Sequence, residues 1–179
     1  MRLVGISGSL RKESNNSKLI AIAKRCVPDG AQFQIADQLD KLPHFNPDLD
    51  INQFDALVQW AELIRRCDGL VISSPEYARG YPGTLKNAFD WLVQTDAHVD
   101  KPFILLNASN RSTVARDSLI VVLQTMSGIY KERSSVTIPL LGKSRPLSQL
   151  LEDNDVVEQI GNALARFVRE LEKDKVEGI

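Results

Sequence analysis

The most chemically suggestive segment is a loop near the start of the chain that is rich in hydroxyl, amide and guanidinium groups. Residues 7–17 are Ser-Gly-Ser-Leu-Arg-Lys-Glu-Ser-Asn-Asn-Ser, directly before a stretch of helical periodicity. Backbone N–H groups at a helix N-terminus favour a phosphate, and Arg11 adds a planar, charged fork of donors. The loop is therefore predicted to bind an anion. Residues 14–17 are all Ser or Asn, which are common helix caps, so capping alone is the alternative.

A second loop combines prolines and glycines with one acidic and two aromatic side chains. Residues 74–84 are Ser-Pro-Glu-Tyr-Ala-Arg-Gly-Tyr-Pro-Gly-Thr. This composition predicts an irregular backbone that exposes amide groups before a helix that begins near Pro82. Glu76 is a candidate general acid or base, but the sequence offers it few partner groups. We expect its side chain to form a salt bridge or a dimer contact instead.

Several better-known nucleotide-binding and catalytic patterns are incomplete. The glycine pattern of the NAD-binding Rossmann motif is absent, which leaves Asp37 without a role as a ribose-binding acid. Residues 142–144, Gly-Lys-Ser, resemble the end of a P-loop that lacks its first glycine. Ser9 occupies a position where a hydrolase nucleophile elbow needs glycine. The two histidines and two separated cysteines form no metal-binding pattern, so neither a metal nor a catalytic triad is predicted.

The elements that must position these loops alternate between short apolar runs and amphipathic segments. Five apolar runs are spaced too widely for hairpins and predict buried strands, at residues 2–6, 33–36, 69–73, 102–106 and 135–138. Helical periodicity marks residues 19–27, 54–64, 85–92, 119–126 and 157–171. This alternation predicts a flavodoxin-like α/β fold, a three-layer sandwich whose five-stranded parallel sheet has the order 2-1-3-4-5 with helices on both faces. Ligands bind beyond the carboxyl ends of such strands, where the two loops would meet.

The composition excludes several classes of protein. The chain has 179 residues, of which 43% are hydrophobic and 25% charged, and this predicts a single folded domain spanning residues 1–179. A net charge of -1 provides no general field for nucleic acid or acidic lipid. The sequence shows no apolar run of membrane-spanning length and no signal segment. Because Cys26 and Cys67 lie in no disulfide or redox motif, we expect a reduced, cytoplasmic protein.

Taken together, these motifs resemble those of the NADPH-dependent FMN reductase family, whose members include quinone, azo-dye and chromate reductases. The resemblance is carried by Gly8-Ser9-Leu10-Arg11 with Ser14 and Asn16, by Ser74-Pro75-Glu76-Tyr77, Pro82-Gly83, Leu85-Lys86-Asn87-Ala88 and Asp90-Trp91, and by residues 42–48. It implies a flavodoxin-like fold that holds FMN noncovalently.

The resemblance also implies which residues bind the cofactor. The phosphate would lie at Ser9, Arg11, Ser14, Asn16 and Ser17. The isoalloxazine ring would be surrounded by Pro75, Glu76, Tyr77 and Ala78, with Ser109 completing the predicted site. The family often has Asn at the position of Ala78 and a glycine-rich loop at the position of residues 107–116. This chain differs from the family at both places, and the resemblance implies that these differences affect the side of the flavin where the substrate binds.

The expected function is that of an FMN-dependent oxidoreductase. It would take hydride from NAD(P)H and pass electrons to free flavin, a quinone or a related small acceptor by a ping-pong mechanism. Tyr77 and Tyr81 are candidate aromatic neighbours of the ring or the nicotinamide, and packing within the loop is the alternative for Tyr81. One alternative is a flavin-binding electron carrier or regulatory flavoprotein with little NAD(P)H turnover. Another is a phosphate-ester hydrolase that uses Ser9 and Arg11, which would lack a base and a metal.

The segment around residues 119–126 predicts self-association. Leu119, Val122, Leu123 and Met126 lie on one helical face, while Ile120 and Val121 extend the apolar surface around the helix. One open sheet can bury only one side of such a helix, so a homodimer or a dimer of dimers is expected, with no nucleic-acid partner and no membrane insertion. Coverage by the C-terminal segment, or by Leu140 and Leu141, is the alternative.

Overall fold

The computed structural model of the protein describes residues 1–140 and 145–178 and contains a parallel, twisted β-sheet. Its strands are β1(Arg2–Ser7), β2(Gln32–Ala36), β3(Gly69–Ser73), β4(Pro102–Asn107), β5(Ile129–Tyr130) and β6(Val136–Thr137). The order along the sheet is β2-β1-β3-β4-β5, and β6 also pairs with β4. The predicted flavodoxin-like strand order is therefore confirmed.

The fifth position of the sheet differs from the prediction, which placed one strand at residues 135–138. Two short strands share this position, because β5 pairs with the first residues of β4 and β6 pairs with its last residues. A 3-10 turn, Glu132–Ser134, lies between them. The N–H of Leu105 faces this interruption and donates a 3.0 Å hydrogen bond to Oγ of Ser135. A side chain thus replaces the missing backbone partner at that point.

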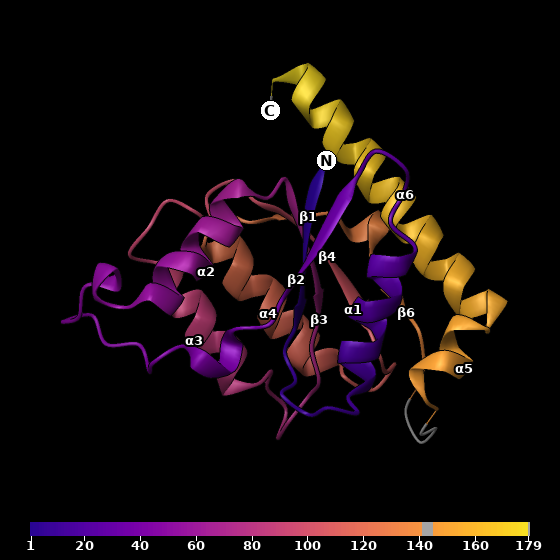
Figure 1. The fold of residues 1–179 in the computed structure, drawn as a ribbon, viewed down its shortest axis with the longest axis horizontal. Coiled ribbons are helices and arrows are strands. Elements are labelled where there is room, and N and C mark those ends of the chain that lie inside the picture. Colours follow the sequence, from indigo (N-terminus) through magenta and orange to yellow (C-terminus); the bar gives the residue numbers. More distant parts are fainter. Residues whose placement is uncertain (141–144, 179) are drawn as a thin grey trace.

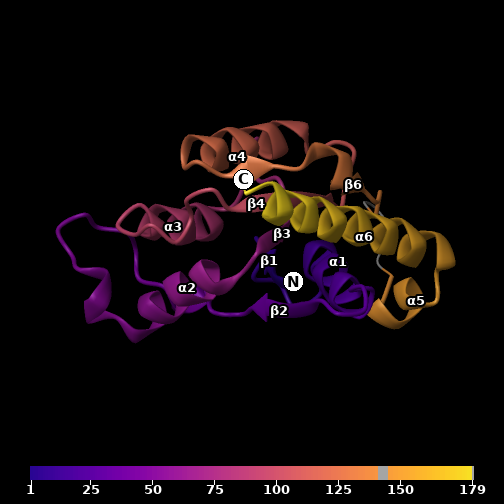
Figure 2. The ribbon, with the colours of Figure 1, turned by 90° about the horizontal axis from the view of Figure 1, so that it is seen from above.

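Helices cover both faces of the sheet (Figures 1 and 2). One face carries α2(Asp55–Arg66), α3(Gly83–Leu92) and α4(Thr113–Thr125), and the other carries α1(Asn15–Arg25), α5(Leu147–Leu151) and α6(Asn154–Glu177). The five predicted helices are present, and α5 is an additional one that the sequence pattern did not indicate. Among the described residues, no helix is both long enough and apolar enough to cross a membrane.

The apolar core is divided by the sheet into two layers. Because successive strand residues point to opposite faces, Val4 and Ile6 pack towards α2, α3 and α4, whereas Leu3 packs towards α1. Gly69 allows the C-terminal helix to approach β3 closely, since a Cβ atom there would lie 2.6 Å from Cζ of Phe167. The two layers give the strands a rigid frame, and their loops emerge from its carboxyl edge.

Residues 42–48, which contributed to the family resemblance, form part of the long connection between β2 and α2. Two side chains of α3 hold this segment by its backbone. Asn87 donates a 2.9 Å hydrogen bond to the carbonyl of Pro43 and accepts one of 2.7 Å from the N–H of Phe45. Trp91 donates a 2.8 Å bond to the same carbonyl of Pro43. The Leu-Lys-Asn-Ala and Asp-Trp motifs thus have a structural role in fixing α3 and this connection.

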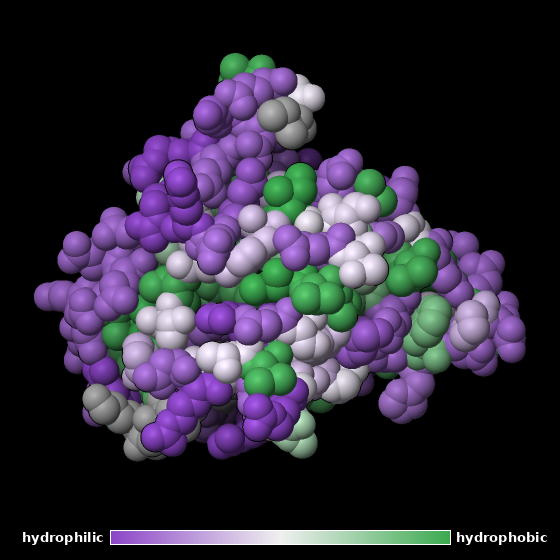
Figure 3. Space-filling model, turned by 180° about the vertical axis from the view of Figure 1, so that it is seen from behind, coloured by the Kyte–Doolittle hydropathy of each residue, from purple (hydrophilic) through white to green (hydrophobic). Residues whose placement is uncertain are grey.

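The outer face of α4 carries an apolar side chain that no described segment covers. Leu119 and Leu123 are buried against the sheet, Ile120 and Val122 are half-buried, and Val121 is 61% exposed. Figure 3 views the molecule from the side on which α4 lies and shows apolar side chains in a band among polar ones. Leu140 and α6 pack on the opposite face of the sheet, so the described part of the C-terminal segment does not cover α4.

Candidate functional site

The loops that follow β1, β3 and β4 meet at the carboxyl edge of the sheet, at the bottom of Figure 1, and enclose a cavity of about 200 Å³. Eight of the ten predicted cofactor residues line the cavity: Ser9, Arg11, Ser14, Asn16, Pro75, Glu76, Tyr77 and Ser109. The two that do not are Ser17 and Ala78. The remaining lining residues are Asn15, Ser74, Ala108 and Ser112. Polar groups from three separate parts of the sequence are therefore brought together at the point where the strand order reverses.

The first wall of the cavity is the N-terminus of α1. Ser14 is the N-cap, and its Oγ accepts a 3.2 Å hydrogen bond from the N–H of Asn16. Ser9 is only 7% exposed, and its Oγ accepts a 3.3 Å hydrogen bond from the N–H of Arg11. The guanidinium of Arg11 is exposed and bonds to no described side chain or carbonyl. Capping and anion binding are compatible here, because each hydroxyl that accepts a backbone bond retains a proton to donate.

Asn16 has a structural contact in addition to its place in the cavity. The side chain is buried, and its Oδ1 accepts a 3.0 Å hydrogen bond from Oγ of Ser73 at the end of β3. The same Ser73 hydroxyl lies 2.6 Å from the carbonyl oxygen of Leu106 on β4. The oxygen of Asn16 therefore takes part in joining α1, β3 and β4. Its two Nδ2 hydrogens are the groups left for a ligand.

The second wall is the loop after β3, which ends in a tight two-residue turn. Tyr77 and Gly80 exchange backbone hydrogen bonds of 2.8 and 3.0 Å. Between them, Ala78 and Arg79 have φ values of 49° and 63°, the left-handed region that side chains other than Gly, Asn and Asp rarely adopt. Ala78 lies at the exposed tip and does not line the cavity. Tyr77 lines the cavity and is 53% exposed, so its ring is at the open mouth.

The side chain of Glu76 has a different partner from the one predicted. Its Oε2 accepts a 3.0 Å hydrogen bond from the backbone N–H of Ala115, in the first turn of α4. A carboxylate is favoured at this position because it meets the partial positive charge of a helix N-terminus. Among the residues that the structure describes, Glu76 caps a helix and forms no salt bridge, while the predicted dimer contact stays a prediction.

The third wall is the loop between β4 and α4. Ser109 is buried, and its Oγ accepts a 3.0 Å hydrogen bond from the N–H of Arg111. Ala108 and Ser112 line the cavity beside it. This wall presents small side chains together with backbone groups that precede a second helix. The cavity is therefore bordered by the N-terminal ends of two helices. The end of α1 favours a negatively charged ligand, whereas the end of α4 is already bonded to the carboxylate of Glu76.

Ser17 lies in a neighbouring hollow rather than in the predicted site. Its Oγ is 2.8 Å from Oγ of Ser7, and both residues line a hollow of about 300 Å³ that shares Ser9 and Arg11 with the main cavity. The position follows from helix geometry, since Ser17 is one residue past Asn16 and turns about 100° away from it. Asp37, which the sequence left without a role, lines the same hollow.

Tyr81 is separated from the cavity by its packing. The ring is half-buried and packs against the core layer formed by α2, α3 and α4. Burial raises the pKa of its hydroxyl to about 12, and the nearby carboxylate of Asp90 acts in the same direction. Tyr81 therefore supports the loop, and Tyr77 is the aromatic side chain at the cavity mouth.

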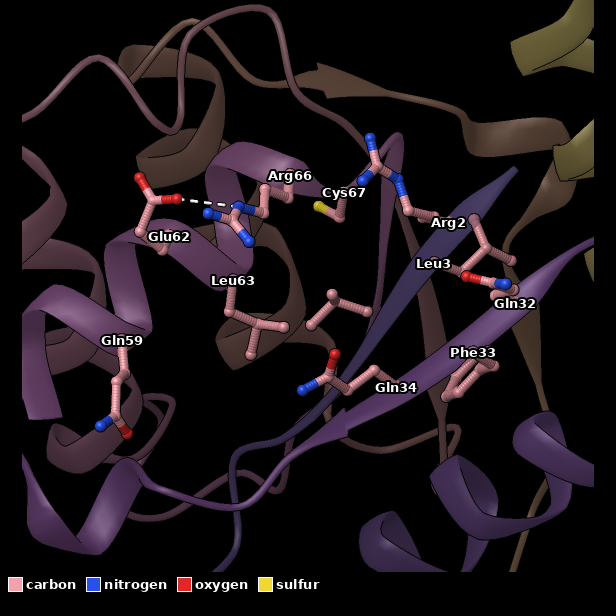
Figure 4. Close-up of a pocket in the computed structure, with 11 residues that line it drawn as sticks. Arg2, Leu3, Gln32, Phe33, Gln34, Gln59, Glu62, Leu63, Arg66 and Cys67 are labelled. Carbon is pink, nitrogen blue, oxygen red and sulfur yellow. Dashed lines mark hydrogen bonds and ion pairs between the residues drawn. The ribbon is translucent and has the colours of Figure 1, made fainter.

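A larger hollow of about 490 Å³ lies at the opposite, amino end of the strands (Figure 4). Arg2, Gln34 and Leu63 are among its lining residues, and none of the predicted site residues is. Its second arginine, Arg66, already donates a 2.9 Å bond to Glu62 and sits at the C-terminus of α2, where a cation complements the helix dipole. Burial raises the pKa of its Cys67 thiol to about 11. Its lining is separate from the loops at the carboxyl edge.

Sequence reasoning missed two side-chain contacts of α1 because these contacts depend on the fold. Asn15 donates a 3.0 Å hydrogen bond to the carbonyl of Leu140, a contact across most of the chain. Lys18 is buried one turn further along α1, where it pairs with Glu13 at 3.0 Å and donates a 3.0 Å bond to the carbonyl of Arg145. A lysine in a helical repeat carries no signal of such burial. The P-loop-like residues 142–144, which include Lys143, lie outside the described residues.

Comparison with known proteins points to one family. The model of the family described as NADPH-dependent FMN reductase matches residues 1–140. An NAD(P)H-dependent FMN reductase of Pseudomonas aeruginosa is 37% identical over 112 residues, which cover 61% of this chain and 60% of that protein. A quinone reductase of Escherichia coli is 36% identical over 94 residues, 51% of this chain and 50% of that protein. The chain thus matches less than two thirds of the length of either relative.

Solved structures show the same fold. The flavoenzyme NAD(P)H:(acceptor) oxidoreductase FerB from Paracoccus denitrificans superposes with a TM-score of 0.84 at 24% identity, over 96% of this chain and 97% of that one. Flavodoxin 1 from Bacillus cereus superposes with a TM-score of 0.55 at 16% identity, over 94% and 98% of the two chains. At these identities the similarity concerns the fold alone.

Proposed function

This chain belongs to the NADPH-dependent FMN reductase family, and from that premise we propose that it is an FMN-dependent oxidoreductase. It would transfer electrons from NAD(P)H to free flavin, a quinone or a related small acceptor. The observation that carries the proposal is the cavity itself. Loops far apart in the sequence converge at the carboxyl edge of a flavodoxin-like sheet, and they present an N-terminal helix end, buried hydroxyls and one guanidinium.

The donor set fits the phosphate end of FMN. Ser9, Ser14 and the Nδ2 group of Asn16 offer side-chain donors beside the N-terminal turn of α1, and Arg11 offers a charged fork at the rim. A phosphate needs this combination of several short-range donors and positive charge. No acidic side chain of this first wall would repel the phosphate, because the side chain of Glu13 is exposed and pairs with Lys18.

The size of the cavity indicates where the rest of the cofactor would lie. At about 200 Å³ it is smaller than the ~300–1,000 Å³ of most small-molecule sites, so it suits the phosphate end and part of the chain that follows. The flat ring would then lie at the mouth, between the loop that carries Tyr77 and the loop that carries Ser109. FMN supplies the hydride and electron chemistry when bound, so the protein needs no nucleophile of its own. Its residues bind the cofactor, orient the ring and leave one face open.

The proposal is tested by cofactor binding. Purified protein should take up FMN in preference to FAD, and a large excess of FMN should raise the melting temperature, because a ligand that binds the native state stabilises it by mass action. A yellow protein with a shifted melting curve is the expected result. If FMN at high excess changes neither the absorbance nor the melting temperature, the flavin assignment is wrong.

Kinetics test the electron transfer and its order. NAD(P)H should be consumed in the presence of a quinone, whereas an electron carrier with little NAD(P)H turnover would consume almost none. If donor and acceptor use the same open face in turn, double-reciprocal plots at several fixed acceptor concentrations should be parallel, the pattern of ping-pong kinetics. Intersecting lines would require both substrates to be bound together and would contradict the single open face.

Assembly and location complete the proposal. We propose a homodimer, or a dimer of two such dimers, that uses the outer face of α4 near the cavity, supported by the exposed Val121. We propose the cytoplasm as the location, supported by Cys26 and Cys67, which are both free thiols.

A further inference from the structure

Glu76 lines the cavity from the loop after β3, while its carboxylate is bonded to a different element. Oε2 accepts the 3.0 Å hydrogen bond from the N–H of Ala115 in α4. Ala115 is buried and does not itself line the cavity. The bond therefore joins the second wall of the cavity to the helix that anchors the third wall.

Helix α4 receives this contact at an end for which its own sequence provides no side-chain cap. Its N-cap residue, Ser112, makes no side-chain capping bond, and the first turn contains no acidic residue. By comparison, α1 is capped by its own Ser14 and α6 by its own Asp153. The first N–H groups of a helix have no partners within the helix, and a carboxylate is favoured there because it also meets the helix dipole. In α4 this partner comes from the opposite wall of the site.

The second wall contains backbone that its surroundings must hold in place. The loop of Glu76 leads into the turn at Ala78 and Arg79, where two residues with side chains have positive φ. Such conformations persist when neighbouring contacts fix them. The third wall leads directly into the helix end that Glu76 caps. Without the bond, binding a ligand between the walls would also have to order them, which reduces affinity.

We propose that Glu76 is a positioning residue for the flavin: by bonding to Ala115, its carboxylate fixes the two loops that would enclose the ring relative to each other. The inference rests on the proposed function, because it concerns the same cavity. It assigns the effect of the Glu76 side chain to the bond with α4 and not to direct contact with the cofactor.

A double-mutant cycle tests this assignment. Glu76→Ala removes the acceptor, and Ala115→Pro removes the donor at a position where the N–H has no partner within the helix. Each single substitution should raise the Kd for FMN about tenfold, roughly the effect of losing one hydrogen bond to a charged group. The double variant should bind no more weakly than either single variant. The visible circular dichroism of bound FMN should change in the same variants, since the ring environment is altered.

Two further variants separate positioning from general stability. Glu76→Gln retains an acceptor oxygen and should recover most of the FMN affinity, which also keeps the test decisive if Ala115→Pro does not fold. Asp50→Ala is the control, because Asp50 caps a short 3-10 helix through a 2.9 Å bond to the N–H of Asn52 and lines no part of the cavity. It should lower the melting temperature slightly without changing the Kd for FMN.

The possible outcomes are distinct. If wild-type protein binds FMN and Glu76→Ala binds it with unchanged affinity, the positioning role is refuted while the proposed function stands. If Glu76→Ala weakens binding equally in the Ala115→Pro background, Glu76 acts directly on the cofactor and the inference is wrong. If wild-type protein itself fails to bind FMN, the proposed function falls and the inference falls with it.

Discussion

Arg11 brings a charge to the cavity without contributing to the fold. Its guanidinium is exposed and bonds to no described residue. Arg11→Ala should therefore weaken FMN binding by about 1.5–3 kcal/mol, equivalent to tenfold to hundredfold in Kd, with little change in the melting temperature. Isothermal titration with FMN measures the effect. Lys12→Ala is the matched control, because Lys12 is also exposed but lines only the neighbouring hollow. Equal affinities for wild type and Arg11→Ala would leave Arg11 as a solvated loop residue.

Ala78 is one of the described residues at which the backbone is poorly matched to the side chain. Its φ of 49° suits Asn or Gly, which tolerate the left-handed region, better than Ala. Ala78→Asn should raise the free energy of unfolding by about 0.5–1 kcal/mol, measured by urea denaturation. Ala78→Val should lower it, because a β-branched side chain is least compatible with positive φ. A stabilising effect of valine would mean that the turn is not held in this conformation.

At this scale, the sequence identified residue types well and their partners poorly. Ser9, Ser14 and Asn16 could be predicted because hydroxyls and amides before a helix are a local pattern. The capping of α4 by Glu76 could not, because it joins residues 39 positions apart that meet only when β3 and β4 lie side by side. The same holds for Asn15 and Leu140, which are 125 positions apart.

At the scale of elements, the junction of α2, α3 and α4 contains a histidine whose charge the fold disfavours. Nδ1 of His98 is buried without a hydrogen-bond partner among the described residues, in a small apolar gap beside Phe89 and Phe103. Burial lowers the pKa of His98, against smaller opposing effects from the backbone of Leu92 and from Asp96. The unfolded chain therefore binds a proton more readily than the folded one.

The sign of the pH dependence follows. Well above pH 6.5, His98 is neutral in the folded and in the unfolded chain and does not reduce the free energy of unfolding. As the pH falls below 6.5 towards the lowered pKa of the folded chain, the unfolded chain takes up the proton first and the free energy of unfolding decreases. The slope due to one proton is at most about 1.4 kcal/mol per pH unit. Urea denaturation between pH 5 and 7 measures it. His98→Gln should flatten the curve, and His44→Gln, at an exposed position, should not. If the slope of the free energy of unfolding against pH is unchanged in His98→Gln, the pH dependence is due to other groups.

The strength of the sequence signal decided which elements could be predicted. Long apolar runs such as β1 and β3, buried on both faces, are unambiguous. The prediction for the fifth position of the sheet was incomplete because β5 and β6 have two residues each, too few to show the two-residue period of a strand. The bond from Leu105 to Ser135 involves a side chain and is not visible in the hydrophobic pattern. The five-residue helix α5 is below the length at which helical periodicity can be recognised.

At the scale of the whole molecule, the exposed face of α4 makes a prediction about assembly. Wild-type protein should be a dimer or tetramer by light scattering at micromolar concentration. Val121→Asp should release folded monomers, because Val121 is 61% exposed in one chain and its replacement costs the monomer fold little. Val176→Asp, at an 89% exposed position near the end of α6, is the control and should leave the assembly intact. A monomeric wild type would refute the interface.

The divided fifth strand also affects how the two edges of the sheet are protected. On that side, two short strands separated by a 3-10 turn present no continuous row of unpaired backbone groups, so another chain finds no template for added pairing. At the other edge, β2 has five residues, Gln-Phe-Gln-Ile-Ala, with neither a charge nor a proline to deter an incoming strand. Aggregation that begins by strand addition should therefore start at β2, and a lysine in place of Gln34 is the substitution best suited to suppress it.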